Sequence, residues 1–275
     1  MSRSRQSYGV LQPGASSRAA CGWRSCFPAT YSWRHLGISL LLLVGAGASA
    51  QPGEGSGASP GGSARERAPI DLTGQWVAII SEDWRWRMVT PALGDFPGIP
   101  MTLEAQHIAE AWDPDRDEAA GEACKAYGAP GLMRGPTRLR ISWRDEDTLE
   151  LESDYGMQTR LFHFDGAPSD GANTWQGVST AEWIMAGNSG FGSMKSVTAE
   201  LRPGYLRKNG VPYSSSTVFT EYWDLHVQDN GDQYLVVTNN VEDPVYLQLP
   251  WFTAIHFKKE DDRSKWDPTS CDARF

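Results

Sequence analysis

The chain has 275 residues, of which 40% are hydrophobic, and its 34 acidic and 25 basic side chains give a net charge of −9 at pH 7. An acidic chain is a poor partner for nucleic acid or for an anionic membrane surface, because both attract clusters of Lys and Arg. The length suffices for one domain with a sizeable hydrophobic core.

Residues 1–50 have the features of an export signal. They contain five arginines and no acidic residue, and they end in an apolar run, LGISLLLLVGAGASA (Leu36–Ala50). The run is shorter than the roughly 20 apolar residues that span a membrane, and its last residues, Ala48-Ser49-Ala50, fit an A-x-A cleavage site. We therefore expect a signal peptide over residues 1–50, a secreted or periplasmic protein, and no membrane insertion after cleavage. An organelle-type presequence is the alternative.

The remaining chain carries 20 basic and 34 acidic residues, a net charge of about −14. Residues 51–68, QPGEGSGASPGGSARERA, are rich in Gly and Ser, and we expect a disordered linker there. The single folded domain should then cover residues 69–275, with its ordered part starting near Ile70. Two cysteines remain in it, Cys124 and Cys271, and an oxidising compartment favours a disulfide between them.

Short apolar or β-branched stretches alternate with turn residues from Ile70 onward, which is the pattern of β-strands. The stretches are QWVAIISEDWRWRM, RLRISW, TLELES, MQTRLFHF, WQGVSTAEW, MKSVTAEL, STVFTEYWDLHV, QYLVVTNNV and FTAIHFKK. Asn209-Gly210 and Asn230-Gly231 predict tight hairpins with type I′ turns, which require positive φ values. We therefore predict an all-β domain built as an antiparallel up-and-down barrel, with a sandwich as the alternative.

One segment has helical rather than strand periodicity. Met101, Ala105, Ile108 and Trp112 are spaced so that they form a single apolar stripe on a helix. We expect a helical insertion after the first strand, at roughly residues 101–126, and such a helix could cap one mouth of a barrel.

The domain opens with DLTGQW (Asp71–Trp76), and this Gly-x-Trp on a first strand resembles the start of a lipocalin or calycin barrel. The resemblance implies that Trp76 closes one end of the barrel and that a basic residue near the last strand, Lys258 or Lys259, covers it. The phrases EDWRWRMVTP, EACKAYGA, LRPGYLRKNGVPYS and VVTNNVEDPVYL also resemble a group of uncharacterised secreted bacterial proteins. That resemblance implies export and a single domain, and it carries no activity.

The segment SEDWRWR, starting at Ser81, has two interpretations as part of a long first strand. Side chains alternate across a strand, so if Trp76 points inward without interruption, Trp84 and Trp86 also line the interior and make an aromatic pocket. A bulge near Ser81–Asp83 would instead turn Asp83, Arg85 and Arg87 inward and make a site for a carboxylate or a developing oxyanion. A third reading is an ordinary core with a solvated edge.

The leading functional hypothesis is a barrel that binds a small apolar or aromatic ligand, because Trp and Tyr combine apolar faces with polar tips. We expect the ligand pocket to be lined by Trp84, Trp86, Trp183, Tyr205 and Tyr213. The turn RPGYLRKNGVPY, which contains Arg207 and Lys208, is either a recognition loop for an anionic or sugar-like ligand or a well-formed turn with solubilising charge.

An enzyme in the same barrel is the alternative hypothesis. TEYWDLHV places Tyr222, Asp224 and His226 on one strand face. Asp224 would orient the imidazole of His226 as the base, Tyr222 would be the acid, and Arg85 would bind an anion, which suits a cofactor-independent lyase, hydratase or isomerase. The same face also fits the polar outer side of an amphipathic strand. A structural or assembly protein is the third hypothesis.

The histidines at positions 107, 163 and 256 lack metal-ligand spacing, and neither an H-E-x-x-H motif nor a calcium loop occurs. We therefore expect no metal and no cofactor. The oligomeric state stays open.

Overall fold

The computed structural model describes residues 61–168, 171–187 and 191–274. The predicted signal peptide and residues 51–60 of the predicted linker lie outside these ranges. Within them, no helix has the length and hydrophobicity that crossing a membrane requires.

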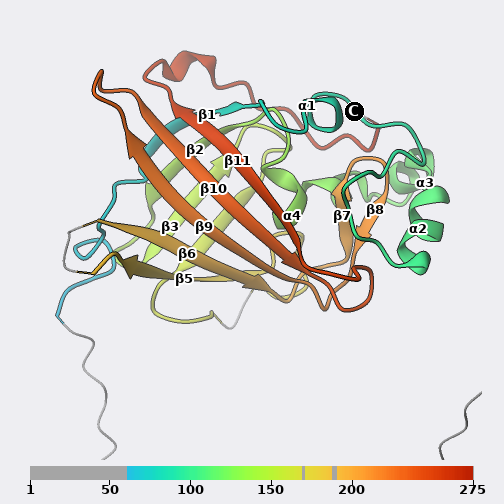
Figure 1. The fold of residues 1–275 in the computed structure, drawn as a ribbon, viewed down its shortest axis with the longest axis horizontal. Coiled ribbons are helices and arrows are strands. Elements are labelled where there is room, and N and C mark those ends of the chain that lie inside the picture. Colours follow the sequence, from blue (N-terminus) through green and yellow to red (C-terminus); the bar gives the residue numbers. More distant parts are fainter. Residues whose placement is uncertain (1–60, 169–170, 188–190, 275) are drawn as a thin grey trace, which may run out of the picture. The chain divides into compact units, whose positions relative to one another are not determined.

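Nine of the described strands form a closed barrel (Figure 1), which confirms the prediction of a mostly β domain with a barrel. The order around the wall is β1-β11-β10-β9-β6-β5-β4-β3-β2. The strands are β1 (Gly74–Ile79), β2 (Arg138–Trp143), β3 (Thr148–Ser153), β4 (Thr159–His163), β5 (Val178–Met185), β6 (Gly192–Ala199), β9 (Val218–Val227), β10 (Gln233–Glu242) and β11 (Trp251–Lys259).

Helices and a short hairpin gather at one end of the barrel, which we call the helical end (Figure 1). The hairpin consists of β7 (Gly204–Arg207) and β8 (Val211–Tyr213). Between β1 and β2 lie α1 (Trp84–Arg87), α2 (Leu103–Glu110), α3 (Pro114–Ala119), the 3₁₀ helix η1 (Ala123–Tyr127) and α4 (Ala129–Leu132); η2 (Arg263–Lys265) follows β11. The Thr102 hydroxyl caps α2 by accepting from the Ala105 amide, and Asp113 caps α3 ahead of Pro114.

The barrel interior is filled with side chains. Alternate residues of each strand point inward, and the largest of them, Trp76, Phe162, Trp223 and Phe257, are fully buried. Met133, just after α4, joins the same core. The prediction of a hollow lined by aromatic rings is therefore wrong for the inside of this barrel, and a ligand site has to lie elsewhere.

One strand pair departs from the predicted antiparallel pattern. β4 and β5 run parallel and are in register over two pairs, Phe162 with Ser179 and His163 with Thr180. A parallel pair needs a crossover connection of about a dozen residues or more, and the segment 164–177 supplies one. All other neighbouring strands of the barrel are antiparallel.

Both Asn-Gly pairs lie in the hairpin connections where we predicted them, but the turn type differs. Gly210 and Gly231 have φ values of 83° and 86°, whereas neither Asn209 nor Asn230 has a positive φ. The Gly210 amide donates to the Arg207 carbonyl, and the Gly231 amide donates to the Gln228 carbonyl. These are turns with glycine at the fourth position, as in type I turns, and not type I′.

An ion pair lies inside the barrel. The guanidinium of Arg160 on β4 donates to both carboxylate oxygens of Glu221 on β9, at 2.9 and 2.6 Å, and both side chains are 0% exposed. The Ser196 hydroxyl donates to the same carboxylate at 3.1 Å, and the Thr198 hydroxyl accepts from Arg160 at 3.3 Å. The pair is thus held by hydroxyl groups from β6.

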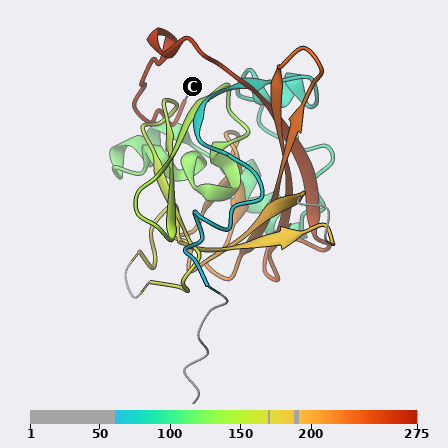
Figure 2. The same cartoon turned by 90° about the vertical axis from the view of Figure 1, so that its left-hand side faces the viewer.

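The segment before β1 crosses the end of the barrel opposite the helical end (Figure 2). Ala64 is buried; its amide donates to Asp147 at 2.7 Å, and its carbonyl accepts from the Trp183 indole at 2.8 Å. Residues 61–68, the end of the predicted linker, therefore pack on the barrel, and the packed part of the chain begins before Ile70. Nearby, the ammonium group of Lys259 lies 5.3 Å from the centre of the Trp76 ring.

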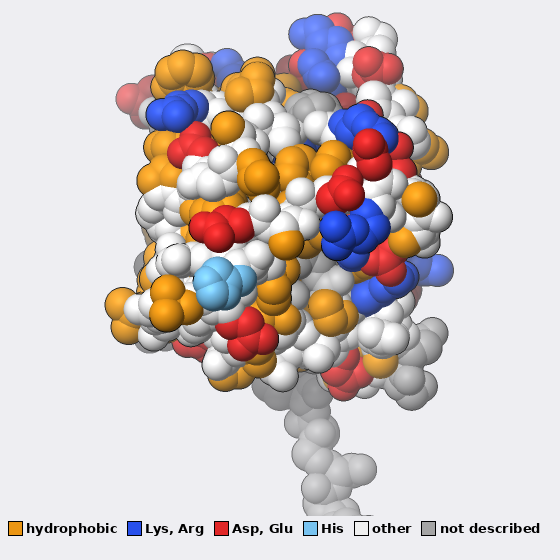
Figure 3. Space-filling view, turned by 90° about the vertical axis from the view of Figure 1, so that its right-hand side faces the viewer, with side chains coloured by type: hydrophobic (Ala, Val, Ile, Leu, Met, Phe, Trp, Pro, Cys, Tyr) orange, Lys and Arg blue, Asp and Glu red, His pale blue; other side chains and the backbone are white. Residues whose placement is uncertain are grey.

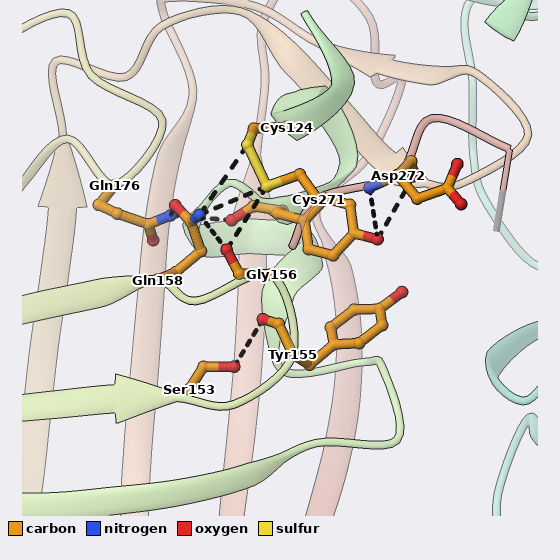
Figure 4. Close-up of a disulfide and its surroundings, with 9 residues drawn as sticks. Cys124, Ser153, Tyr155, Gly156, Gln158, Gln176, Cys271 and Asp272 are labelled. Atoms are coloured by element: carbon orange, nitrogen blue, oxygen red, sulfur yellow. Dashed lines mark hydrogen bonds between the residues drawn. A yellow bond between two sulfur atoms is a disulfide. The ribbon is translucent and has the colours of Figure 1, made fainter. Parts of the chain in front are cut away.

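The disulfide between Cys124 and Cys271 is present and ties the C-terminal segment to the helical end (Figure 4). It lies beside Gln158, whose side-chain amide donates to the Gly156 carbonyl at 2.6 Å. A hydrogen bond also holds the C-terminal segment, because the Asp272 amide donates to the Tyr127 hydroxyl at 3.2 Å. The covalent bond and these hydrogen bonds together hold the C-terminal segment at the helical end.

Candidate functional site

The structure separates the five predicted ligand-binding residues. Trp183 lies at the end of the barrel covered by residues 61–72, where its ring stacks on Phe164 with centroids 4.9 Å apart. Tyr205 and Tyr213 belong to the β7–β8 hairpin: the Tyr205 hydroxyl donates to Asp117 at 2.8 Å, and Tyr213 is buried in a second core. Trp84 is 65% exposed on α1.

The predicted acid–base set is divided between two elements, because Arg85 is not on the strand that carries the other three residues. Tyr222, Asp224 and His226 are on the outer face of β9, opposite the inward Trp223, and Tyr222 is 37% exposed. Asp224 accepts a hydrogen bond from the Ser193 hydroxyl. Arg85 lies on α1 and pairs with Asp95 at 2.9 Å. The three residues of β9 line none of the cavities described below.

The segment SEDWRWR adopts neither strand phase, because β1 ends at Ile79 and residues 84–87 form one turn of helix. Asp83, the residue before the helix, has a left-handed backbone with φ 52°. A helical turn points successive side chains in different directions, so Trp84 faces solvent while Trp86 and Arg87 face the protein. The expectation that Trp84 and Trp86 share one face is therefore wrong.

Trp86 lies in the wall of a cavity of about 330 Å³ at the helical end. We call it the arginine–tryptophan cavity. Its other polar walls are Glu82, Asp83 and Arg207, and its second tryptophan is Trp251 at the start of β11. The lining is completed by Pro97, Gly98, Phe252, Thr253 and Ala254. Three segments far apart in the sequence thus meet: the α1 region, the β7–β8 hairpin and β11.

Arginine side chains lie close to both indole rings of this cavity. The guanidinium carbon of Arg207 lies 5.3 Å from the centre of the Trp86 ring and 5.8 Å from that of Trp251. Arg134, which follows α4, lies 4.8 Å from the Trp251 ring. At these distances the positive charges are attracted to the faces of the rings.

Two of the three neighbouring arginines have acidic partners. Arg87 pairs with Glu82 and also donates to the Arg134 carbonyl at 2.9 Å. Arg134 pairs with Asp83 at 2.9 Å. Glu82 is also bonded to His256, with 3.1 Å between a carboxylate oxygen and Nδ1. Both carboxylates on the wall of the cavity are therefore already engaged by cationic or imidazole groups.

Arg207 is the exception. It is only 5% exposed, its Nε and one terminal nitrogen have no hydrogen-bond partner among the protein atoms described, and no carboxylate of those residues lies within ion-pair distance. Burial, aided by repulsion from Arg134, lowers its pKa to about 10, so it stays protonated at neutral pH. A buried positive charge without its own anion is costly and is a mark of functional sites.

A second, smaller cavity of about 20 Å³ lies behind Trp86 and Arg207, which line both. It has room for about one water molecule. Lys208 lines it, with Nζ 4.4 Å from the centre of the Tyr155 ring and 5.1 Å from that of Tyr127. Burial lowers the pKa of Lys208 to about 6.

Replacing Lys208 by Met should raise the melting temperature in a pH-dependent way. Between about pH 6 and about pH 10.5 the unfolded chain binds a proton at Lys208 that the folded protein does not, so the stability of the wild type rises with pH in this window. Met binds no proton in either state. The melting temperature of Lys208→Met should therefore exceed that of the wild type most at pH 6–7, and the difference should shrink towards pH 10.

Circular dichroism melting curves from pH 6 to pH 10 measure this difference. Lys195, on the outer face of β6, provides the matched control, because Lys195→Met should show no such trend. A difference for Lys208→Met that is independent of pH would contradict the low pKa.

Three larger hollows lack the combination of features found in the arginine–tryptophan cavity. One of about 500 Å³ lies over β3, β4 and β5, one of about 440 Å³ lies over β1 and β2, and one of about 370 Å³ lies between residues 65–73 and Trp143. The first two are lined by no Trp, Tyr or Phe, and the third has Trp143 as its one aromatic residue, whereas ligand sites are typically rich in aromatic and apolar side chains. Size alone therefore does not decide the choice of site.

Sequence reasoning found part of this site. The sequence predicts Trp86 as a ligand-binding residue. For the turn that contains Arg207, a recognition loop for an anionic or sugar-like ligand is one of the two interpretations. Trp251 and Arg134 were missed, because each stands alone in its segment without a motif. Among the described residues no group of three or more His, Cys, Asp or Glu side chains is arranged to hold a metal ion.

Comparison with known proteins adds no relative: no family model, no curated protein and no solved structure matches this chain.

Proposed function

We propose that the protein binds a small molecule with a flat ring in the arginine–tryptophan cavity. The observation that carries the proposal is the meeting of Trp86, Trp251 and the unpartnered Arg207 around a cavity of about 330 Å³. That volume is at the lower end of the range of ligand sites, so it suits a molecule of one or two rings. The barrel serves as a rigid support, since its interior is packed.

Export and a lipocalin-like origin are part of the proposal. The disulfide supports export, because such bonds persist in oxidising compartments. A lipocalin-like relationship is supported by Lys259 over Trp76, the arrangement that the Gly-x-Trp resemblance implies; of the two candidates, Lys258 instead pairs with Asp232 at 2.9 Å.

The test compares two tryptophans of the same helical turn. Calorimetric titration of the wild type with a panel of aromatic and terpenoid compounds should find at least one that binds saturably. Trp86→Ala should weaken that binding about tenfold, because an aromatic contact and its buried area are lost. Trp84→Ala should leave it unchanged, because Trp84 lies outside the cavity and is exposed.

Two results would overturn the proposal. One is the absence of saturable binding across the whole panel. The other is an equal loss of binding in Trp84→Ala and Trp86→Ala, which would show that the cavity is not the site.

A further inference from the structure

We infer that the ligand carries a single negative charge, a carboxylate joined to its ring, and that Arg207 binds this group; the inference rests on the proposed function. The ligand site and the small cavity behind it are lined by three arginines, Arg87, Arg134 and Arg207, and by two carboxylates, Glu82 and Asp83. Arg85 beside Trp86 and the nearby Asp95 pair with each other and leave the sum unchanged. One positive charge is left over.

The excess charge belongs to Arg207. Glu82 is taken by Arg87, and Asp83 is taken by Arg134 at 2.9 Å. Lys208 adds little charge at neutral pH, because burial lowers its pKa to about 6. Figure 3 shows the face that carries the helices, where acidic and basic side chains lie close together among hydrophobic ones. At the cavity, by contrast, the positive charge of Arg207 has no negative charge paired with it.

Arg207 is placed to bind such an anion, because it lines the cavity and has no ion-pair partner among the described residues. Its guanidinium carbon lies 5.3 Å from the centre of the Trp86 ring and 5.8 Å from that of Trp251. Two of its nitrogens, Nε and one terminal nitrogen, are buried without a hydrogen-bond partner. Arginine binds carboxylates through charge-assisted N–H···O bonds.

A molecule with a ring and a carboxylate would contact both the tryptophans and the arginine of the cavity wall. The ring would pack on Trp86 and Trp251, and the carboxylate would reach Arg207 between them. The two engaged carboxylates on the wall, Glu82 and Asp83, disfavour a second negative charge on the ligand. The ligand class is therefore an aromatic monocarboxylate.

Indole-3-acetate, its neutral analogue indole-3-acetamide and the cation tryptamine test this class, because they share one ring. Titration calorimetry on the wild type at neutral pH should give indole-3-acetate an affinity about ten to a hundred times that of the amide, as expected for a charge-assisted hydrogen bond. Tryptamine should bind no better than the amide.

Variants locate the contact. Arg207→Gln should reduce the affinity for indole-3-acetate to that of the amide and leave the amide unchanged. Arg202→Gln is the matched control: Arg202 precedes the same hairpin and lies 4.2 Å from the Trp175 ring, but it pairs with Glu122 and lines neither cavity. It should keep the preference for indole-3-acetate.

The outcomes separate the inference from the proposed function. If the acetate and the amide bind equally and both depend on Trp86, the function stands and the inference fails. If the preference for the acetate survives in Arg207→Gln, the anion is bound elsewhere and the inference fails. If none of the three ligands and no panel compound binds, the function fails as well. The wild-type comparison holds even if a variant does not fold, which melting curves show independently.

Discussion

Replacing Arg160 by Met is expected to lower the free energy of unfolding by about 3–5 kcal/mol. The substitution leaves Glu221 in the middle of an apolar core with its counter-charge gone, because both side chains are 0% exposed. The remaining partner of the carboxylate, the Ser196 hydroxyl at 3.1 Å, cannot replace a cation. Urea denaturation followed by circular dichroism measures the loss.

Removing both charges separates the cost of an orphaned carboxylate from the value of the pair. The double variant Arg160→Met/Glu221→Leu should lose much less than the sum of the two single variants, because neither charge is left alone. Lys195→Met breaks the exposed pair between Lys195 and Glu182 and should change stability by less than about 1 kcal/mol. A loss below 1 kcal/mol for Arg160→Met would contradict the buried position of the pair.

Removing the disulfide in Cys124→Ala/Cys271→Ala should lower the free energy of unfolding by about 2–5 kcal/mol. The two cysteines are 147 residues apart, so their bond closes a long loop in the unfolded chain. It also holds the C-terminal segment against Tyr127 and Gln158, where the hydrogen bonds are partly buried. The measurement is denaturation of the wild type and of the variant, each with and without dithiothreitol.

The reductant arm provides the internal control. Dithiothreitol should lower the stability of the wild type to that of the double variant and should not affect the variant, because no other cysteine lies in the described part of the chain. Equal stability of oxidised and reduced wild type would contradict the predicted contribution of the bond.

The sequence predicts the barrel because the alternation of inward apolar and outward polar residues is a local property of each strand. It even indicates the interior ion pair: Arg160 is two residues from Phe162, and Glu221 is two from Trp223, so each charge shares a strand face with a core residue. The parallel pairing of β4 and β5 was not predictable in this way, because it depends on where the connection between them crosses.

The segment SEDWRWR is a clearer case of a structure that the local sequence does not determine. Alternating Trp and Arg fit a strand as well as a single turn of helix, and nothing in the segment itself decides between them. The decision comes from distant contacts, since Arg87 donates to the Arg134 carbonyl and Trp86 packs near Arg207. The site has the same origin: Trp86, Arg207 and Trp251 span more than half of the folded chain, and no spacing between them carries a signal.

The short parallel ladder between β4 and β5 changes what the interior charges do. With only two residue pairs in register, backbone hydrogen bonds hold this part of the wall weakly. Arg160 extends from β4 to Thr198 on β6 and to Glu221 on β9, so it connects the strands on both sides of the junction from within. Without that connection β4 and β5 would become free edges, and free edges recruit strands from other molecules. The buried pair of Arg160 and Glu221 would then oppose self-association of the protein as well as its unfolding.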